Sequence, residues 1–383
     1  MPVAEDYLLL GLRLGKHVDG LVDAYYGPQD LKDAVDEEPL VHASELADDG
    51  ARLHAELADG WLRDQVHGLW TYARVLAGEK LSYSDEVERC YGVRPQRTPE
   101  SVYEEVHAKL DELLPGDGSL YERRVAWRDR HRVSGDAALA GMRALLPLFR
   151  RRTAELFGLP DGEDVTLEPV TGEPWWAFNY YLGGLQSRVV LNTDTPTTTL
   201  DLLGLVAHEV YPGHHTEAAL KEQHLIRERG LVEEAAKLVP TPQSILAEGI
   251  AETGLDLVFD PGGSDEALAV LRDQGLPLDD PVLAWEIRET IEGLGTLGLD
   301  AALMIHEEGV GFDEAVQWYV RWAMRPLDEA RHALAFVVDP TWRAYVISYT
   351  AGRELCRRYV GGDPARFRTL LTEQVTVTEL LSA

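Results

Sequence analysis

Residues 202–215 read Leu-Leu-Gly-Leu-Val-Ala-His-Glu-Val-Tyr-Pro-Gly-His-His, so an apolar run changes abruptly into a cluster of imidazoles and a carboxylate. The apolar part predicts a buried helix. Such a helix needs partners for polar side chains, because an unpaired polar group is costly to bury. Imidazole and carboxylate groups are typical ligands of zinc. The stretch therefore predicts a metal-binding helix, or a structural one if the histidines only interact with the negative pole of a helix end.

The spacing of the histidines differs from the plain H-E-x-x-H motif, in which both ligands lie on one helix face about 6 Å apart. The position four residues after His208 is Pro212. On an unbroken helix His214 would point about 120° away from His208, and His215 would return to the same face about 10.5 Å along the axis. On an unbroken helix, neither His214 nor His215 is therefore well placed to bind the same metal ion as His208.

Pro212 and Gly213 are predicted to remove this difficulty by bending the helix. Proline cannot donate an N–H to the preceding turn and its ring clashes with that turn, while glycine relaxes the limits on the backbone. The pair is interpreted as a two-residue insertion that brings His214 to the place of an i+4 histidine, a defect common at functional sites. His215 then supports the ligands, or is itself the ligand in place of His214.

Two glutamates supply the other parts of a hydrolytic zinc site. Glu209 adjoins His208, and Glu248 lies in the segment Ala-Glu-Gly-Ile-Ala at 247–251. Three protein ligands leave one position on the ion open for water, and a spare carboxylate can act as general base.

This pattern, H-E-x-x-P-G-H-H followed by E-G-x-A, resembles the signature of the bacterial family called domain of unknown function 885, which is related to the gluzincin zinc metallopeptidases. The resemblance covers roughly residues 80–380 and is specific around 208–215. Ile250 departs from the gluzincin pattern, which has an aromatic residue there. The resemblance implies one zinc ion held by His208, His214 and Glu248, with Glu209 as general base. Glu252 is the alternative to Glu248 as a ligand, although it has no counterpart in the family pattern.

A late segment, Ser348-Tyr349-Thr350-Ala351-Gly352, resembles the Ser-Tyr-x-x-Gly segment of the same family. Gluzincins place a tyrosine or histidine against the developing oxyanion, where a donated hydrogen bond stabilises the intermediate more than the ground state. The resemblance makes Tyr349 the candidate donor. The alternative is that Tyr345 and Tyr349, four residues apart, are a packing pair on one helix face.

Helical periodicity dominates the chain, beginning with a helix predicted over residues 4–26, and only 162–200 is rich in strand-forming residues. Strands are predicted there at 166–170, 176–182 and 187–192. The last is the candidate edge strand for pairing with an extended substrate, with Arg188 or Asn192 binding a substrate carboxylate. The alternative is a small structural sheet. The predicted fold is mainly α and gluzincin-like, with a small sheet next to the metal-binding helix.

The composition of the chain argues against some classes of binding partner. The chain has 66 acidic and 36 basic residues, a net charge of −30, which argues against nucleic acid or an anionic membrane surface. Its two cysteines form no disulfide framework. The sequence shows neither a signal segment nor a long apolar run, so a cytoplasmic protein is expected. Oligomeric state is left open.

The sequence therefore predicts a helical lobe at 1–160 and a metal-binding lobe at 161–383, or one continuous domain. The expected activity is zinc-dependent hydrolysis of peptide bonds, with a peptide or small amide as substrate. The alternatives are hydrolysis of another amide or an ester, and a metal-bound scaffold without turnover. Manganese or cobalt could replace zinc in such a ligand set.

Overall fold

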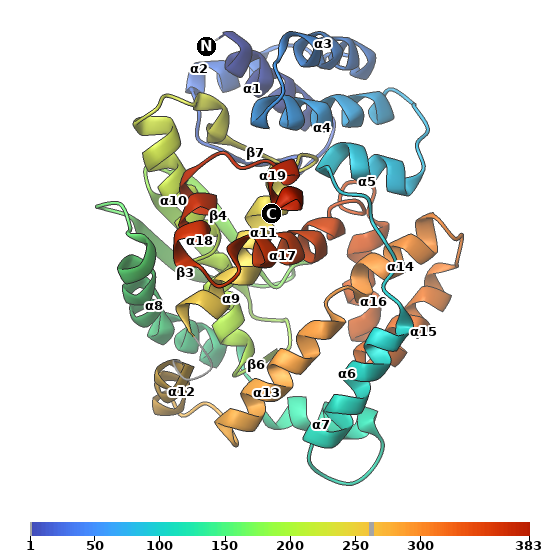
Figure 1. The fold of residues 1–383 in the computed structure, drawn as a ribbon, viewed down its shortest axis with the longest axis vertical. Coiled ribbons are helices and arrows are strands. Elements are labelled where there is room, and N and C mark those ends of the chain that lie inside the picture. The colour runs from blue at the N-terminus through green and yellow to red at the C-terminus, as the bar shows by residue number, and fades with distance from the viewer. Residues whose placement is uncertain (1, 260–263) are drawn as a thin grey trace.

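The computed structural model describes residues 2–259 and 264–383. The chain is mainly helical with small β-sheets (Figure 1), which confirms the predicted class. The three predicted strands are present as β3 (Asp164–Val170), β4 (Ala177–Gly183) and β5 (Gln186–Asn192). They precede α9 (Asp201–Glu209) in the sequence, and β4 contacts it in space.

A layer of four helices forms one end of the molecule (Figure 1). It consists of α1 (Pro2–Gly15), α2 (Gln29–Glu37), α3 (Ala43–Glu56) and α4 (Trp61–Leu76). Its apolar side chains form a core of their own, including Leu14, Leu46 and Leu69. The predicted helix at 4–26 is wrong beyond Gly15, because β1 (Val22–Tyr25) follows and pairs antiparallel with the distant β7 (Ala236–Leu238).

A larger core unites described residues between Tyr83 and Leu380, so the predicted boundary at residue 160 runs through this core. Met142 and Phe149 of α8 (Gly135–Phe157) are buried together with Leu202 of α9 and Ile250 of α11 (Gln243–Val258). The helices that precede the sheet are α5 (Tyr83–Tyr91), α6 (Glu100–Leu113), α7 (Leu120–Arg130) and α8 (Gly135–Phe157), and the short strands β2 (Arg132–Val133) and β6 (Thr197–Thr198) pair with each other.

The helices after α9 continue to the end of the chain. They are α10 (His214–Lys221), α11 (Gln243–Val258), α12 (Ser264–Asp273), α13 (Pro281–Ile291), α14 (Leu297–His306), α15 (Phe312–Ala323), α16 (Leu327–Ala335), α17 (Val346–Val360), α18 (Pro364–Thr372) and α19 (Val377–Ser382). A π-helical turn spans Glu222–Arg227, and 3-10 turns span Val232–Ala235, Glu292–Leu294 and Phe336–Val338.

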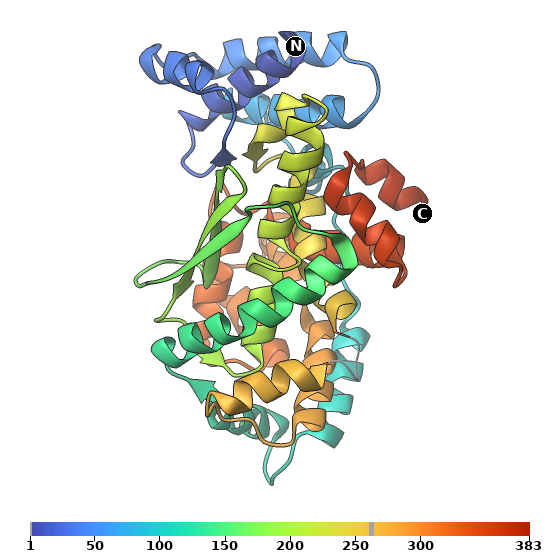
Figure 2. The same ribbon diagram turned by 90° about the vertical axis from the view of Figure 1, so that its left-hand side faces the viewer.

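The three-stranded sheet runs along one side of the molecule (Figure 2) and has the order β3-β5-β4. β5 is parallel to β3 and antiparallel to β4. Side chains alternate across a strand, and the face of β5 that carries Ser187, Val189 and Leu191 is buried toward the helices. The expectation that 187–192 is an edge strand is wrong, because β5 is paired on both sides; β4 is an edge.

Two glycines allow α11 and α17 to pack closely against each other. A β-carbon on Gly249 of α11 would overlap the carbonyl of Gly352 on α17, and one on Gly352 would lie 3.0 Å from the nitrogen of Gly249. With no side chain at either position, the two backbones touch. Figure 1 shows α11 and α17 side by side at the centre of the molecule. This contact brings Glu248, next to Gly249, toward the tyrosines that precede Gly352.

Candidate metal centre

The backbone bends between the two halves of the histidine motif, as predicted. α9 ends at Glu209 and α10 begins at His214, and the peptide bond from Tyr211 to Pro212 is cis. The N–H of Gly213 donates to the carbonyl of Ala207 at 2.8 Å, which folds the chain back against the end of α9. The bend therefore starts α10 beside the last turn of α9 rather than further along its axis.

The bend brings together three side chains that are far apart on a straight helix or in the sequence. The Nε2 atoms of His208 and His214 lie 3.2 Å apart. The carboxylate of Glu248 lies 3.3 Å from Nε2 of His208 and 3.7 Å from Nε2 of His214. The donor atoms of all three residues fall within 4.8 Å of one another. Of the two histidines that could follow His208, it is His214 that converges on it.

The geometry and burial of this cluster fit a zinc ion. Two nitrogen ligands about 2.0–2.1 Å from a tetrahedral zinc lie about 3.3–3.4 Å apart, close to the observed separation of His208 and His214. The Oε2 atom of Glu248 is buried without a hydrogen-bond partner in the described residues. A buried carboxylate oxygen without a hydrogen bond is costly, and a cation at this point would satisfy it.

The two imidazoles differ in proton affinity. Desolvation opposes a charge on His208, yet Glu248 and Glu252 raise its pKa well above the usual value. Burial lowers the pKa of His214 to about 4. His214 is therefore neutral and ready to coordinate, whereas binding of a cation at His208 would release a proton.

Groups around the cluster orient the candidate ligands. Glu252 lies 3.1 Å from Nδ1 of His208, on the opposite side of the ring from the cluster. It supports that histidine rather than standing in for Glu248, an arrangement that fixes the tautomer in many metal sites. The Tyr345 hydroxyl donates to Oε1 of Glu248 at 2.5 Å. The spacing of Tyr345 and Tyr349 in the sequence suggests only a packing pair and does not reveal this contact.

His215 points away from the cluster and is fully buried. Its Nδ1 lies 2.8 Å from the Ser187 hydroxyl and its Nε2 lies 2.8 Å from Oε2 of Glu163. The Tyr211 hydroxyl donates to the same glutamate oxygen at 2.6 Å. This network ties both sides of the bend to the sheet, so His215 supports the motif and is not a ligand in this arrangement.

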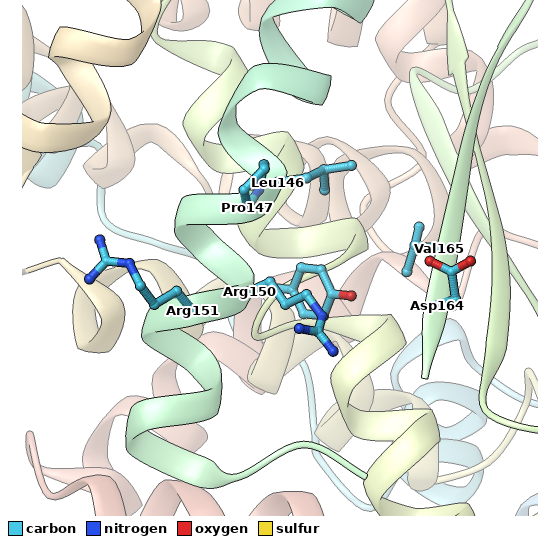
Figure 3. Close-up of a pocket in the computed structure, with 7 residues that line it drawn as sticks. Leu146, Pro147, Arg150, Arg151, Asp164 and Val165 are labelled. Atoms are coloured by element: carbon cyan, nitrogen blue, oxygen red, sulfur yellow. The ribbon is translucent and has the colours of Figure 1, made fainter. Parts of the chain in front are cut away.

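A pocket of about 310 Å³ lies on the far side of this network (Figure 3). It is lined by Leu146, Pro147, Arg150, Arg151, Asp164, Val165 and Tyr211. Arg150 joins this network from the side of the pocket, because its Nε donates to Glu163 at 2.6 Å. None of the candidate ligands lines this pocket.

Glu209 is buried beside His208 and is held by the sheet. The Asn179 side chain of β4 donates to the backbone carbonyl of Glu209 at 2.5 Å. Burial raises the pKa of Glu209 to about 7, and the negative charges of Glu248 and Asp23 act in the same direction. A carboxylate that accepts a proton near neutral pH suits a general base.

Tyr349 lies beside the cluster, with its ring stacked on His208 at a centroid distance of 6.4 Å. Its side chain is 37 % exposed, and its hydroxyl has no hydrogen-bond partner in the part of the chain that the structure describes. Desolvation and the charges of Glu248 and Glu209 raise its pKa well above 10. The phenol therefore keeps its proton and is free to donate it in a hydrogen bond.

The two predicted substrate-binding residues of β5 are not at the cluster. Arg188 and Asn192 share a face of the strand, as expected, but it is the face opposite the one that contacts α10. The guanidinium of Arg188 lies over the ring of Tyr180 at 4.4 Å. The Asn192 amide donates to the carbonyls of Glu173 and Trp175 at 2.8 and 3.0 Å. Both side chains serve the sheet and its loop, so this prediction is corrected.

Comparison with known proteins shows a shared fold and no named family. No family model and no curated protein matches the sequence. The crystal structure titled "the putative lipoprotein from Colwellia psychrerythraea" matches with a TM-score of 0.55 and 14% identity over 97% of this chain and 64% of that chain. A second structure, "a putative lipoprotein of unknown function from Shewanella oneidensis", matches with a TM-score of 0.48 and 12% identity over 93% of this chain and 69% of that chain.

The first match establishes the fold alone, and this chain spans 64% of the length of that relative. In the described residues, no helix combines the length and apolar character needed to cross a membrane. The similarity to the family of domain of unknown function 885 and a cytoplasmic location both remain predictions.

Proposed function

We propose that this chain is a zinc-dependent hydrolase that cleaves amide bonds, with peptides as its substrates. The proposal is supported above all by the convergence of His208, His214 and Glu248, with Glu209 next to the first of them in the sequence. The chemistry that a zinc ion supplies at such a site is polarisation of a carbonyl and a lower pKa for a water molecule, toward about 7.

The side chains of the chain have separate roles in this proposal. Glu209 accepts the proton of the attacking water and later returns it to the leaving amine. Tyr349 donates a hydrogen bond to the developing oxyanion, which a protonated phenol without another partner can do. Glu252 and Tyr345 hold His208 and Glu248 in position. These roles require that Glu209 can accept a proton near neutral pH and that Tyr349 keeps its proton, and burial and the neighbouring charges favour both.

An unpaired strand edge offers a way to hold an extended substrate. β4 is an edge of the sheet and is attached to Glu209 through Asn179. Main-chain groups at an edge pair with an added strand regardless of its side chains. In this proposal β4, rather than β5, aligns the substrate beside Glu209.

A scaffold without turnover fits the same residues less well. Structural zinc sites are closed by four protein ligands, whereas catalytic sites have three and an open position. The described residues bring three candidate ligands together, as in a catalytic site. A closed structural site would leave the buried Glu209 without a chemical role.

Incubation of the zinc-loaded protein with a mixed peptide library, followed by mass analysis, tests the proposal. Cleavage is expected, with loss of cleavage after chelation and recovery when zinc is added back. Stoichiometric metal without cleavage of any peptide would instead indicate the scaffold, and cleavage of esters alone would indicate another hydrolase.

A further inference from the structure

Four arginines gather around one glutamate, between α7 and α16. Arg128 of α7 is buried, and its Nη1 lies 2.8 Å from Oε2 of Glu329 on α16. The guanidinium groups of Arg325 and Arg132 lie 3.8 and 3.9 Å from the same carboxylate. Arg124 precedes Arg128 by four residues, so the two share a face of α7. These four residues are called the arginine cluster below.

The arginine cluster carries more positive charge than the neighbouring carboxylates neutralise. Glu329 is shared by three of the arginines, and Asp129 pairs with Arg132 at 3.1 Å. Asp201 is the third carboxylate that acts on the cluster. Four guanidinium groups therefore face three carboxylates, in a chain whose net charge is −30.

Arg124 is the member of the cluster that lacks a partner. Among residues 2–259 and 264–383, it is the one half-buried arginine with neither a hydrogen bond nor an ion pair. Burial and the positive charges of Arg128 and Arg325 lower the pKa of Arg124 to about 9, so it is still charged at neutral pH. An unpaired charge is costly to bury, and a bound anion would remove that cost.

Contacts at the start of α9 place the cluster two helical turns from the candidate metal centre. Arg132 lies opposite Thr198 where β2 pairs with β6. The backbone N–H and the hydroxyl of Thr198 both donate to Asp201, the first residue of α9, at 2.7 Å. His208 lies seven residues further along this helix, which is a rise of about 10.5 Å.

α16 gives the same spacing by a second route. Glu329 precedes Phe336, the first residue of the 3-10 turn after α16, by seven residues, again about 10.5 Å. The ring of Phe336 packs against that of Tyr349 with centroids 6.4 Å apart, and Tyr349 stacks on His208. Figure 1 shows α7 and β6 on the side of α9 away from the four-helix layer. Two helices therefore lead from the cluster to the metal centre.

We propose that the arginine cluster binds a carboxylate of the substrate, either its C-terminal carboxylate or an acidic side chain, about three residues from the cleaved bond. The inference rests on the proposed function and makes Arg124 a specificity-determining residue. An extended chain advances about 3.3 Å per residue, so three residues span the two helical turns. The planar guanidinium group suits this role because it can donate two parallel hydrogen bonds to a carboxylate.

Binding to an inactive variant tests this inference without relying on turnover. Zinc-loaded Glu209→Gln protein is dialysed to equilibrium against three pools of N-acetylated pentapeptides of Ala, Leu, Phe and Ser, and bound peptide is measured by mass spectrometry. The first pool has a free C-terminal carboxylate, the second is C-terminally amidated, and the third is amidated and contains one glutamate. The pools thus separate the two sources of a carboxylate.

One or both carboxylate-bearing pools are expected to bind at least about tenfold more tightly than the amidated pool without glutamate, the size of a charge-assisted hydrogen bond. Arg124→Gln in the same background should reduce that preference to about twofold or less, because the amide forms no charge-assisted bond. Arg130→Gln removes an exposed arginine from another face of α7. This matched control should leave the preference unchanged, because an exposed charge is screened by salt.

A purely structural role for Arg124 leads to a different expectation. Loss of a structural contact would lower the free energy of unfolding, whereas removal of an unpaired, half-buried charge should leave it equal or raise it. Urea unfolding distinguishes the two and verifies that the variant folds. Arg325→Gln, which changes a side chain that is 41% exposed, should also reduce the preference, and it decides the question if Arg124→Gln is destabilised.

Equal binding of all three pools, no binding of any pool, or a preference that survives in the deciding variant would overturn the inference. A surviving preference is the result expected if the carboxylate binds only to the zinc ion. A wild-type protein that cleaves no peptide would contradict the proposed function alone, because the carboxylate preference is measured on a variant that needs no turnover. The two failures are therefore distinguishable.

Discussion

Gly213 lies so close to the backbone of His208 that a β-carbon at this position would overlap the carbonyl oxygen of that histidine. With no β-carbon, the glycine permits this contact. Its φ of −77° and ψ of −134° also lie outside the α and β regions of other residues, in keeping with the predicted relief of backbone limits at the bend.

Gly213→Ala should weaken both the fold and the metal centre. Overpacking of this kind costs about 1–3 kcal/mol, and any movement of the bend separates His214 from His208. Urea unfolding and zinc titration measure the two effects. Gly204→Ala, on the same helix pair but with open space around its position, is the matched control and should be neutral or slightly stabilising. Wild-type zinc affinity in Gly213→Ala would show that the contact does not position the site.

Glu209→Gln should abolish turnover and leave the metal bound. The amide cannot accept the proton of the attacking water, and loss of a general base typically lowers the rate by about 10²–10⁴-fold. Metal content per chain is expected to be unchanged, because Glu209 is not among the three converging groups. Full activity in this variant would remove the role assigned to Glu209.

The tyrosines at 345 and 349 should differ in what they control. Tyr345→Phe removes the hydrogen bond to Glu248 and should lower metal affinity by about 10–100-fold, as for other groups that orient ligands. Tyr349→Phe should instead lower kcat by about 10²–10³-fold with little change in metal affinity. Metal titration and steady-state kinetics on both variants separate the roles. The opposite assignment of effects would contradict them.

The buried ion pair between Glu217 and Lys221 of α10 should make the stability of the fold depend on pH in the acidic range. Nζ of Lys221 lies 2.7 Å from the fully buried carboxylate of Glu217. Burial acts against ionisation of Glu217, but Lys221 and Lys237 lower its pKa to about 2. Since this folded-state pKa lies below the unfolded value, the stabilisation is complete above about pH 4.5 and is lost as the pH falls toward 2.

Glu217→Gln should therefore cost about 3–5 kcal/mol at pH 7, because Lys221 is left buried without its partner. The difference from the wild type should shrink between about pH 4.5 and pH 2. Urea unfolding at pH 7, 4 and 3 measures it. A difference that is constant over this range, or absent at pH 7, would contradict the assigned ion pair.

The local parts of the fold and site could be predicted from the sequence. The apolar run before His208, the Pro-Gly pair and the strand-rich segment at 162–200 each carry their signal within a few neighbouring residues. The bend and the three strands follow from such signals. Glu248 was placed by family resemblance, and the touching glycines at 249 and 352 explain how its helix reaches the tyrosines.

The parts that the sequence did not indicate depend on distant pairing. β1 pairs with the distant β7, which local periodicity cannot reveal, so the sequence favours a helix over the whole of 4–26. The sequence suggests an edge strand at 187–192 because no local signal reveals that β3 pairs with β5 in parallel. The partners of His215 come from Glu163 and Ser187, which no motif links to a histidine.

Metal content of protein purified without an affinity tag tests the central claim most directly. After zinc loading and extensive dialysis, elemental analysis should find one equivalent of zinc per chain in the wild type. Less than about a tenth of that amount is expected in His214→Ala, which loses one of three ligands. A wild type that retains no zinc, or a His214→Ala variant that retains a full equivalent, would contradict the proposed metal centre.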